Sequence, residues 1–106
     1  MNKANNIAGV NADEMERLQS VFDAEASVAE VILYGSRAKE THRPGSDIDL
    51  TLKGNALTTG WLMDLASKID DLLLPYEVDL SIFEHIDNPN LIDHINRVGK
   101  VVFSNE

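Results

Sequence analysis

Two short segments with strict alternation constrain the fold most strongly. Residues 46–52 (SDIDLTL) and 77–83 (EVDLSIF) each carry apolar side chains at every second position and acidic or hydroxyl side chains between them. Side chains alternate between the two faces of a β-strand, so each segment predicts a strand with one buried face and one polar face. Residues 28–34 (VAEVILY) are rich in β-branched and aromatic residues and predict a third, buried strand.

Helical patterns separate and flank these strands. Asn11 with Glu14 three residues later forms a variant of the capping box, which predicts a helix beginning at residue 12. Apolar residues at helical spacing then predict three helices, near residues 12–26, from residue 58 or 59 to 74, and from 89 to 98, and a short edge strand at 100–103. The order of these elements favours an α/β (α+β) fold with a small mixed sheet flanked by helices. We expect residues 1–11 to form a flexible tail and 12–106 to form a single domain.

Charge and composition exclude several classes of function. The 106 residues include 18 acidic and 9 basic side chains, which gives a formal net charge of −9. Because a sequence-independent grip on a nucleic-acid backbone requires a basic surface, direct nucleic-acid binding is not expected. No cysteine is present, so thiolate metal sites and disulfides are excluded, which suits a cytoplasmic protein. We see no apolar run long enough to span a membrane and no signal peptide.

The polar faces of the two alternating segments carry the candidate catalytic residues. Asp47 and Asp49 lie two residues apart, and Asp79 has the same local pattern in the second segment. If the two strands are close neighbours, the three carboxylates converge on one face. Two unit charges 4 Å apart repel by about 4 kcal/mol at an effective dielectric constant near 20, so such a cluster favours a cation or a bound proton. Oxygen ligands alone suit Mg²⁺ or Mn²⁺.

A second candidate feature lies at the end of the buried strand. Gly35 and Ser36 follow this strand, and a short helix could begin at Ser36. Backbone N–H groups at such a turn attract phosphate, and Arg37 opens a run of basic residues that reaches Arg43. A phosphate clamp beside a carboxylate-bound metal is the combination that nucleotide transfer needs. Taken alone, each feature is more often ordinary surface or a turn, and only the combination favours a site. The histidines His85 and His94 are interpreted as surface polar residues.

The combined motif resembles a known family. Gly35-Ser36, ten further residues and then Asp47-Ile48-Asp49 resemble the signature of the nucleotidyltransferases related to DNA polymerase β. The string LYGSRAKETHRPGSDIDL is similar to that of the smallest prokaryotic branch, the minimal nucleotidyltransferases (MNT), and YEVDLSIF resembles the strand that carries the third carboxylate. The resemblance covers about residues 13–103 and implies a polymerase β-like fold.

The resemblance also implies an activity. Asp47 and Asp49 would hold two Mg²⁺ or Mn²⁺ ions that bridge the triphosphate of ATP or another NTP, and Asp79 would bind one ion and help to deprotonate the attacking hydroxyl. Gly35 and Ser36 would contact the β- and γ-phosphates, with Arg37 nearby.

The expected product is a nucleoside monophosphate, usually AMP, on a protein acceptor. Proteins of this branch are commonly encoded beside a helical HEPN-domain toxin. Within such a pair the nucleotidyltransferase is the antitoxin.

Two departures from the family pattern keep alternatives open. Lys39-Glu40 replaces the usual Arg-Gly, and Gly45 stands where Asp or Asn is common. A glycine at position 40 could serve a positive φ angle or a close approach of phosphate. No second domain is expected to hold the acceptor, so a partner would supply that surface. The alternatives are a non-catalytic module that neutralises a HEPN partner by binding, and a transferase acting on small molecules.

Overall fold

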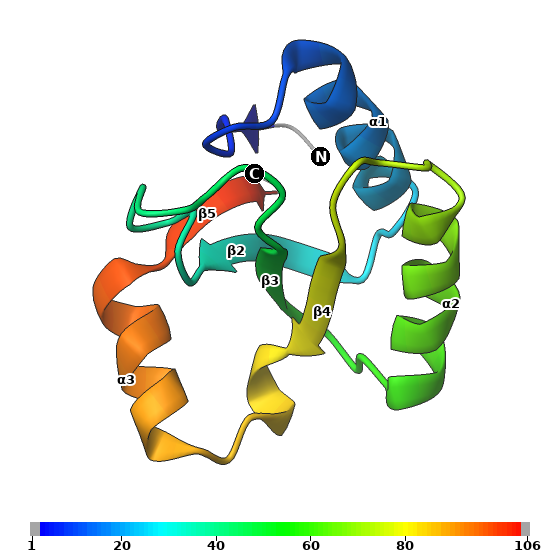
Figure 1. Ribbon diagram of the computed structural model, residues 1–106. Coiled ribbons are helices and arrows are strands. Elements are labelled where there is room, and N and C mark those ends of the chain that lie inside the picture. The colour runs from blue at the N-terminus through cyan, green and yellow to red at the C-terminus, as the bar shows by residue number, and fades with distance from the viewer. Residues whose placement is uncertain (1–2, 105–106) are drawn as a thin grey trace.

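The computed structural model describes residues 3–104 and contains one five-stranded mixed sheet with helices on both faces (Figure 1). The strand order is β1-β5-β2-β3-β4. Along the chain the elements are β1 (Lys3–Ala4), α1 (Ala12–Asp23), β2 (Val28–Tyr34), β3 (Ile48–Gly54), α2 (Thr59–Asp70), β4 (Val78–Ile82), the 3₁₀ turn η1 (Phe83–His85), α3 (Pro89–Val98) and β5 (Lys100–Ser104).

The sheet combines antiparallel and parallel pairs. β2 runs antiparallel to both β3 and β5, and β5 also pairs with the short β1. β3 and β4 are parallel and are joined through α2, as a parallel pair requires a crossover connection. The predicted mixed sheet flanked by helices is therefore confirmed.

The two faces of the sheet are covered differently. The main core lies between the sheet and the helices α1 and α2, where Leu18 and Leu65 pack with the buried residues of β3. On the other face α3 packs against β2, where Ile95 and Ile32 are both buried outside the main core. Figure 1 shows α3 on the side of the sheet away from α1 and α2. Because α3 covers only part of its face, Asp49 of β3 is only half-buried and Asp79 of β4 is exposed, whereas Thr51 further along β3 is fully buried.

Local sequence signals explain where the helices begin. Asn11 and Glu14 form the predicted capping box at the start of α1, with each side chain bonded to the other's backbone N–H. Thr58 accepts from the N–H of Trp61 at the start of α2, and Asn88 caps α3. The helix ends differ from the predictions, because α1 stops at Asp23 and α2 at Asp70. After α2 the chain tightens into turn hydrogen bonds before it reaches β4.

The strand β3 begins two residues later than predicted. Ser46 is not part of the ladder, because its backbone N–H donates to the carbonyl of Arg43 and its hydroxyl accepts from the N–H of Arg43. These two bonds close a turn, and regular pairing starts at Ile48. Asp47 therefore lies in the connection immediately before β3 rather than inside the strand.

The expectation of a flexible tail over residues 1–11 needs correction within the described chain. Lys3–Ala4 form β1 against β5, and Ile7 is 1% exposed in the main core. The backbone N–H of Asn5 donates to the carbonyl of Val102. Ile7, Ala8 and Val10 follow neither a helical nor an alternating period, so only the tertiary structure shows that this segment packs. Met1 and Asn2 lie outside the described residues. Among residues 3–104, no helix has the length and apolarity needed to cross a membrane.

Candidate functional site

The candidate site begins with a row of side chains across three strands. Tyr34 of β2 pairs with Asp49 of β3, and Asp49 pairs with Asp79 of β4 in the parallel register. Residues directly opposite each other place their side chains on the same face of a sheet. The predicted convergence of Asp49 and Asp79 therefore follows from the register. The face is the one that α3 partly covers, since Ile32 lies two residues before Tyr34 on the same strand.

Asp49 has the most perturbed environment of the three carboxylates. Burial raises the pKa of Asp49 above its ordinary value of 3.8, the charges of Asp79 and then Asp47 raise it further, and a charged His94 would lower it. Asp47 and Asp79 are exposed. Mutual repulsion at a partly buried carboxylate is the condition that a hard cation or a proton relieves.

The carboxylates supply suitable metal ligands without forming a finished cage. Asp47, Asp49 and Asp79 offer only oxygen donors, which fit Mg²⁺ or Mn²⁺. Within residues 3–104, however, no group of three or more His, Cys, Asp or Glu side chains is gathered closely enough to hold an ion. The donor set thus fits a divalent cation, and binding would require the three side chains to draw together. The predicted metal site stays a prediction.

Gly35 directly follows β2 and packs against the carboxylate of Asp49. Its φ of +76° lies in the left-handed region, and a Cβ atom at this position would overlap the Asp49 carboxylate. Only glycine fits both conditions. The predicted helix at Ser36 is wrong, since residues 36–40 form a turn. In this turn the N–H of Lys39 donates to the Gly35 carbonyl at 3.2 Å, and the N–H of Thr41 donates to the Ser36 carbonyl at 2.9 Å.

Arg37 was predicted to lie near the phosphates, but its guanidinium is buried and bonds to backbone carbonyls. It is 2% exposed, and its guanidinium donates to the carbonyls of Ala8 at 2.7 Å and Ser46 at 2.6 Å. The same group lies 4.7 Å from the centroid of the Tyr76 ring. Arg37 therefore connects the N-terminal segment to the turn before β3, and its guanidinium N–H groups are used in these contacts.

We expect Arg37→Ala to destabilise the protein by about 2–3 kcal/mol, because the substitution leaves two carbonyl groups without their charged donor. The exposed Arg43→Ala is the matched control and should change the free energy of unfolding little. Urea denaturation of both variants measures the difference. Equal stability of the two variants would contradict the structural role.

The backbone conformation explains the two departures from the family pattern, at Glu40 and at Gly45. Glu40 adopts a φ of +57°, so the position where glycine is usual does use the left-handed region. Its carboxylate lies 3.8 Å from the ammonium of Lys100 in an exposed ion pair, which contributes little. Gly45 has a φ of +81°, and a Cβ atom at this position would meet nothing within 4 Å. Asn and Asp tolerate this conformation as well, so Gly45 keeps the turn that those residues allow.

Glu40→Gly is expected to stabilise the fold by up to about 1 kcal/mol. A left-handed backbone costs a residue with a Cβ about 1–2 kcal/mol, and the larger entropy of an unfolded glycine takes back about 0.5–1 kcal/mol. Lys39→Gly is the matched control, since Lys39 has no positive φ and should lose stability. Thermal unfolding measures the melting temperatures of the two variants. A shift of both melting temperatures in the same direction would contradict this explanation.

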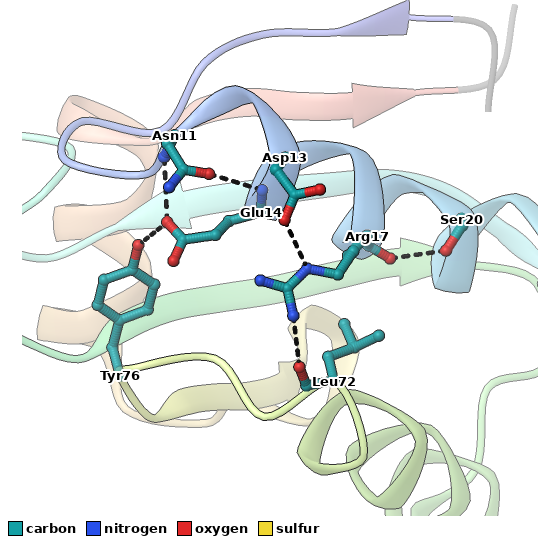
Figure 2. A network of polar contacts seen from close by, with 7 residues as sticks. All are labelled: Asn11, Asp13, Glu14, Arg17, Ser20, Leu72 and Tyr76. Carbon is teal, nitrogen blue, oxygen red and sulfur yellow. Dashed lines mark hydrogen bonds and ion pairs between the residues drawn. The ribbon is translucent and has the colours of Figure 1, made fainter.

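An open cleft lies beside Asp47, near the start of β3 and β4. It has a volume of about 650 Å³ and is lined by residues that include Asp47, Asp70, Leu73, Leu74, Glu77 and Val78. The connection between α2 and β4 forms one wall, and Figure 2 shows how α1 holds both of its ends. Arg17 donates to the carbonyl of Leu72 at 2.6 Å, and the Tyr76 hydroxyl donates to Glu14. The cleft offers room for a small ligand next to Asp47.

Two neighbours of the carboxylates were not identified from the sequence. His94, interpreted as a surface residue, accepts a hydrogen bond from the backbone N–H of Gly35 through Nε2 at 3.1 Å. Tyr34 stands beside Asp49, and burial raises the pKa of its phenol. In the sequence, the position of Tyr34 directly before Gly35 is a signal that places Tyr34 next to the predicted site. No sequence signal links His94 to Gly35, because they meet only through the packing of α3 on β2.

Comparison with known proteins supports the fold and the motif. Residues 16–106 match the family described as "Polymerase beta, Nucleotidyltransferase". Comparison with curated protein sequences gives no significant match.

Solved structures of similar fold include a toxin–antitoxin complex with AMP-PNP. Its matching chain is 22% identical, with a TM-score of 0.69 over 86% of this chain and 73% of that one. A second is the tri-AMPylated HEPN toxin of Shewanella oneidensis in complex with its MNT antitoxin, at 19% identity and a TM-score of 0.60 over 85% of this chain and 71% of that one. A third is the toxin–antitoxin complex MntA–HepT, with the same identity and TM-score over 85% of this chain and 72% of that one. At these identities the likeness shows the fold alone.

Proposed function

Because the chain belongs to the polymerase β nucleotidyltransferase family, we propose that it transfers AMP from ATP to a protein acceptor, a helical HEPN-type partner, and acts as the antitoxin of that pair. The observation that carries the catalytic part is the register that places Asp49 opposite Asp79, with Gly35 packed against Asp49. This arrangement brings two carboxylates from separate strands beside the turn that follows β2.

Each proposed role follows from the position of the residue. Asp47 and Asp49 would hold divalent ions, which neutralise the charge of the triphosphate and of the leaving pyrophosphate when bound. Ser36, in the turn that follows β2, would donate its hydroxyl to the phosphates. Asp79 is exposed at the far side of the row, where an incoming acceptor hydroxyl can reach it, and would accept the proton of that hydroxyl.

The proposed reaction balances as a single displacement. The acceptor oxygen forms a bond to the α-phosphorus of ATP while the bond from that phosphorus to the β-phosphate bridging oxygen breaks. The hydroxyl proton passes to Asp79, and pyrophosphate leaves with the electrons of the broken bond. The protein's contribution is positioning and charge stabilisation, which dominate phosphoryl-transfer catalysis.

The proposed partner is supported by the neighbours in fold and by charge. All three similar structures named above are described as toxin–antitoxin complexes, and one of them contains a tri-AMPylated HEPN toxin. The net charge of −9 on this chain would speed association with a basic, RNA-cleaving protein. Neutralisation by binding alone is the second candidate, favoured by the lack of a preformed metal-holding group among residues 3–104.

Co-expression with the protein encoded beside this one tests both candidates. We expect the two chains to co-purify, and the intact mass of the partner to increase by one or more AMP groups with ATP and Mg²⁺. The double variant Asp47→Asn with Asp49→Asn should still bind the partner but leave its mass unchanged. If the double variant nevertheless suppresses toxicity fully, neutralisation is by binding. If neither a complex nor a mass shift appears, the antitoxin proposal fails.

A further inference from the structure

The packing of α3 brings His94 to the Gly35 turn. Its Nε2 atom accepts a hydrogen bond from the backbone N–H of Gly35 at 3.1 Å. Its ring meets the ring of Tyr34 edge to face, with 6.2 Å between the centroids and 80° between the planes. His94 is thus held by two consecutive residues at the end of β2, both beside Asp49.

The hydrogen bond sets the chemical form of the histidine. Because Gly35 donates its N–H, Nε2 must be the unprotonated nitrogen, and the ring proton lies on Nδ1. The same bond satisfies the one N–H group of Gly35, whose Cα lies against the Asp49 carboxylate with no room for a side chain. The Gly35 peptide is therefore fixed by His94 on one side and packed against Asp49 on the other.

His94 lies on a capped helix that packs against β2 at Ile95 and at Gly99. α3 begins at the Asn88 cap with Pro89 in its first turn, and Ile95, next to His94, is 3% exposed. At the other end Gly99 approaches Ile32 so closely that a Cβ would lie 2.9 Å from its side chain. A side chain held by such packing keeps its partner in place more precisely than one on a mobile loop does.

We propose that His94 is a positioning residue for the transfer reaction, which holds the Gly35 peptide against Asp49 and so keeps the turn after β2 aligned with the carboxylate row. The inference rests on the proposed function for its catalytic consequence. The contact itself, from the Gly35 N–H to the His94 ring, is independent of that function. His94 acts through Gly35 and is not assigned any contact with the substrate.

The test compares three variants of the full chain. His94→Ala removes the acceptor, His94→Gln places an amide oxygen near the position of Nε2, and His85→Ala is the matched control, because His85 is exposed in η1. Backbone amide spectra of ¹⁵N-labelled protein report on Gly35 and Asp49. We expect the Gly35 amide proton to move upfield in His94→Ala, to remain near its original shift in His94→Gln, and to be unaffected by His85→Ala.

Transfer kinetics with the partner give the second readout. Misplacement of a site by about 1 Å can cost about 10²-fold in rate, so we expect His94→Ala to lower kcat by about 10- to 100-fold. His94→Gln should recover most of that loss. An unmoved Gly35 amide in His94→Ala, or a full rate despite a moved amide, would overturn the inference. If wild type itself transfers nothing, the proposed function fails, and the inference is then decided by whether the Gly35 and Asp49 amides move together.

Discussion

Asp49→Asn is expected to lower the rate of AMP transfer by about 10³-fold while raising the thermal stability of the free protein. The loss of rate follows because Asp49 would hold a divalent ion that neutralises the charge of the triphosphate, and loss of one such electrostatic contribution typically costs about 10²- to 10³-fold. The gain in stability follows from burial and from the neighbouring charges of Asp79 and Asp47, which disfavour the ionised carboxylate in the folded state. The amide of asparagine is neutral and nearly the same size, so it removes the repulsion without a cavity.

The pH dependence of stability should show the same effect. The folded-state pKa of Asp49 lies above the ordinary value of 3.8, so the folded protein binds more protons than the unfolded chain between these two values. The Asp49 contribution to stability is therefore greatest below pH 3.8 and is lost as the pH rises through the folded-state pKa. Asp49→Asn should remove that part of the pH dependence.

The exposed Asp64→Asn on α2 is the matched control and should change neither the rate nor this profile. Thermal unfolding over a pH series and single-turnover transfer measure the two effects. A destabilised Asp49→Asn would show that the carboxylate has a structural partner rather than repulsive neighbours. Unchanged transfer would remove Asp49 from the catalytic group.

Gly35→Ala is expected to reduce both transfer and stability. The substitution meets two obstacles, because the φ of +76° is strained for alanine and the new Cβ would overlap the Asp49 carboxylate. Together these effects should cost about 2–4 kcal/mol in the free energy of unfolding. Transfer should fall by about 10²-fold or more, since the carboxylate has to move away from its place in the row.

Gly45→Ala separates the two obstacles. Gly45 has nearly the same backbone angle, with a φ of +81°, but a Cβ there would meet nothing within 4 Å. This control should therefore show only the net backbone cost, up to about 1 kcal/mol, because loss of the unfolded-state entropy of glycine offsets part of the strain. The difference between the two variants measures the contact between Gly35 and Asp49. Equal losses of stability in the two variants would show that this contact is not restrictive.

The secondary structure and the core of the site could be predicted from short-range patterns in the sequence. The alternation predicted which side chains share a face within the observed strands, at residues 48–52 and 78–82 but not at Asp47, and the capping box of Asn11 and Glu14 predicted the start of α1. These predictions succeeded because side-chain direction in a strand and hydrogen bonding at a helix start depend on residues only two or three positions apart. The convergence of Asp49 and Asp79 needed one further step, the pairing of their strands.

The supporting residues were decided only by the tertiary structure. Arg37 lies in a basic run that suggested phosphate binding, yet its guanidinium donates to the backbone carbonyls of Ala8 and Ser46. His94 reaches Gly35 across 59 positions of the chain, and Ile7 enters the core from a segment with no periodic pattern. Each of these contacts joins segments whose distance in space depends on how α1, α3 and the sheet pack together. Local patterns therefore predicted the strands that carry Asp49 and Asp79, whereas long-range packing decided which distant segments Arg37, His94 and Ile7 contact.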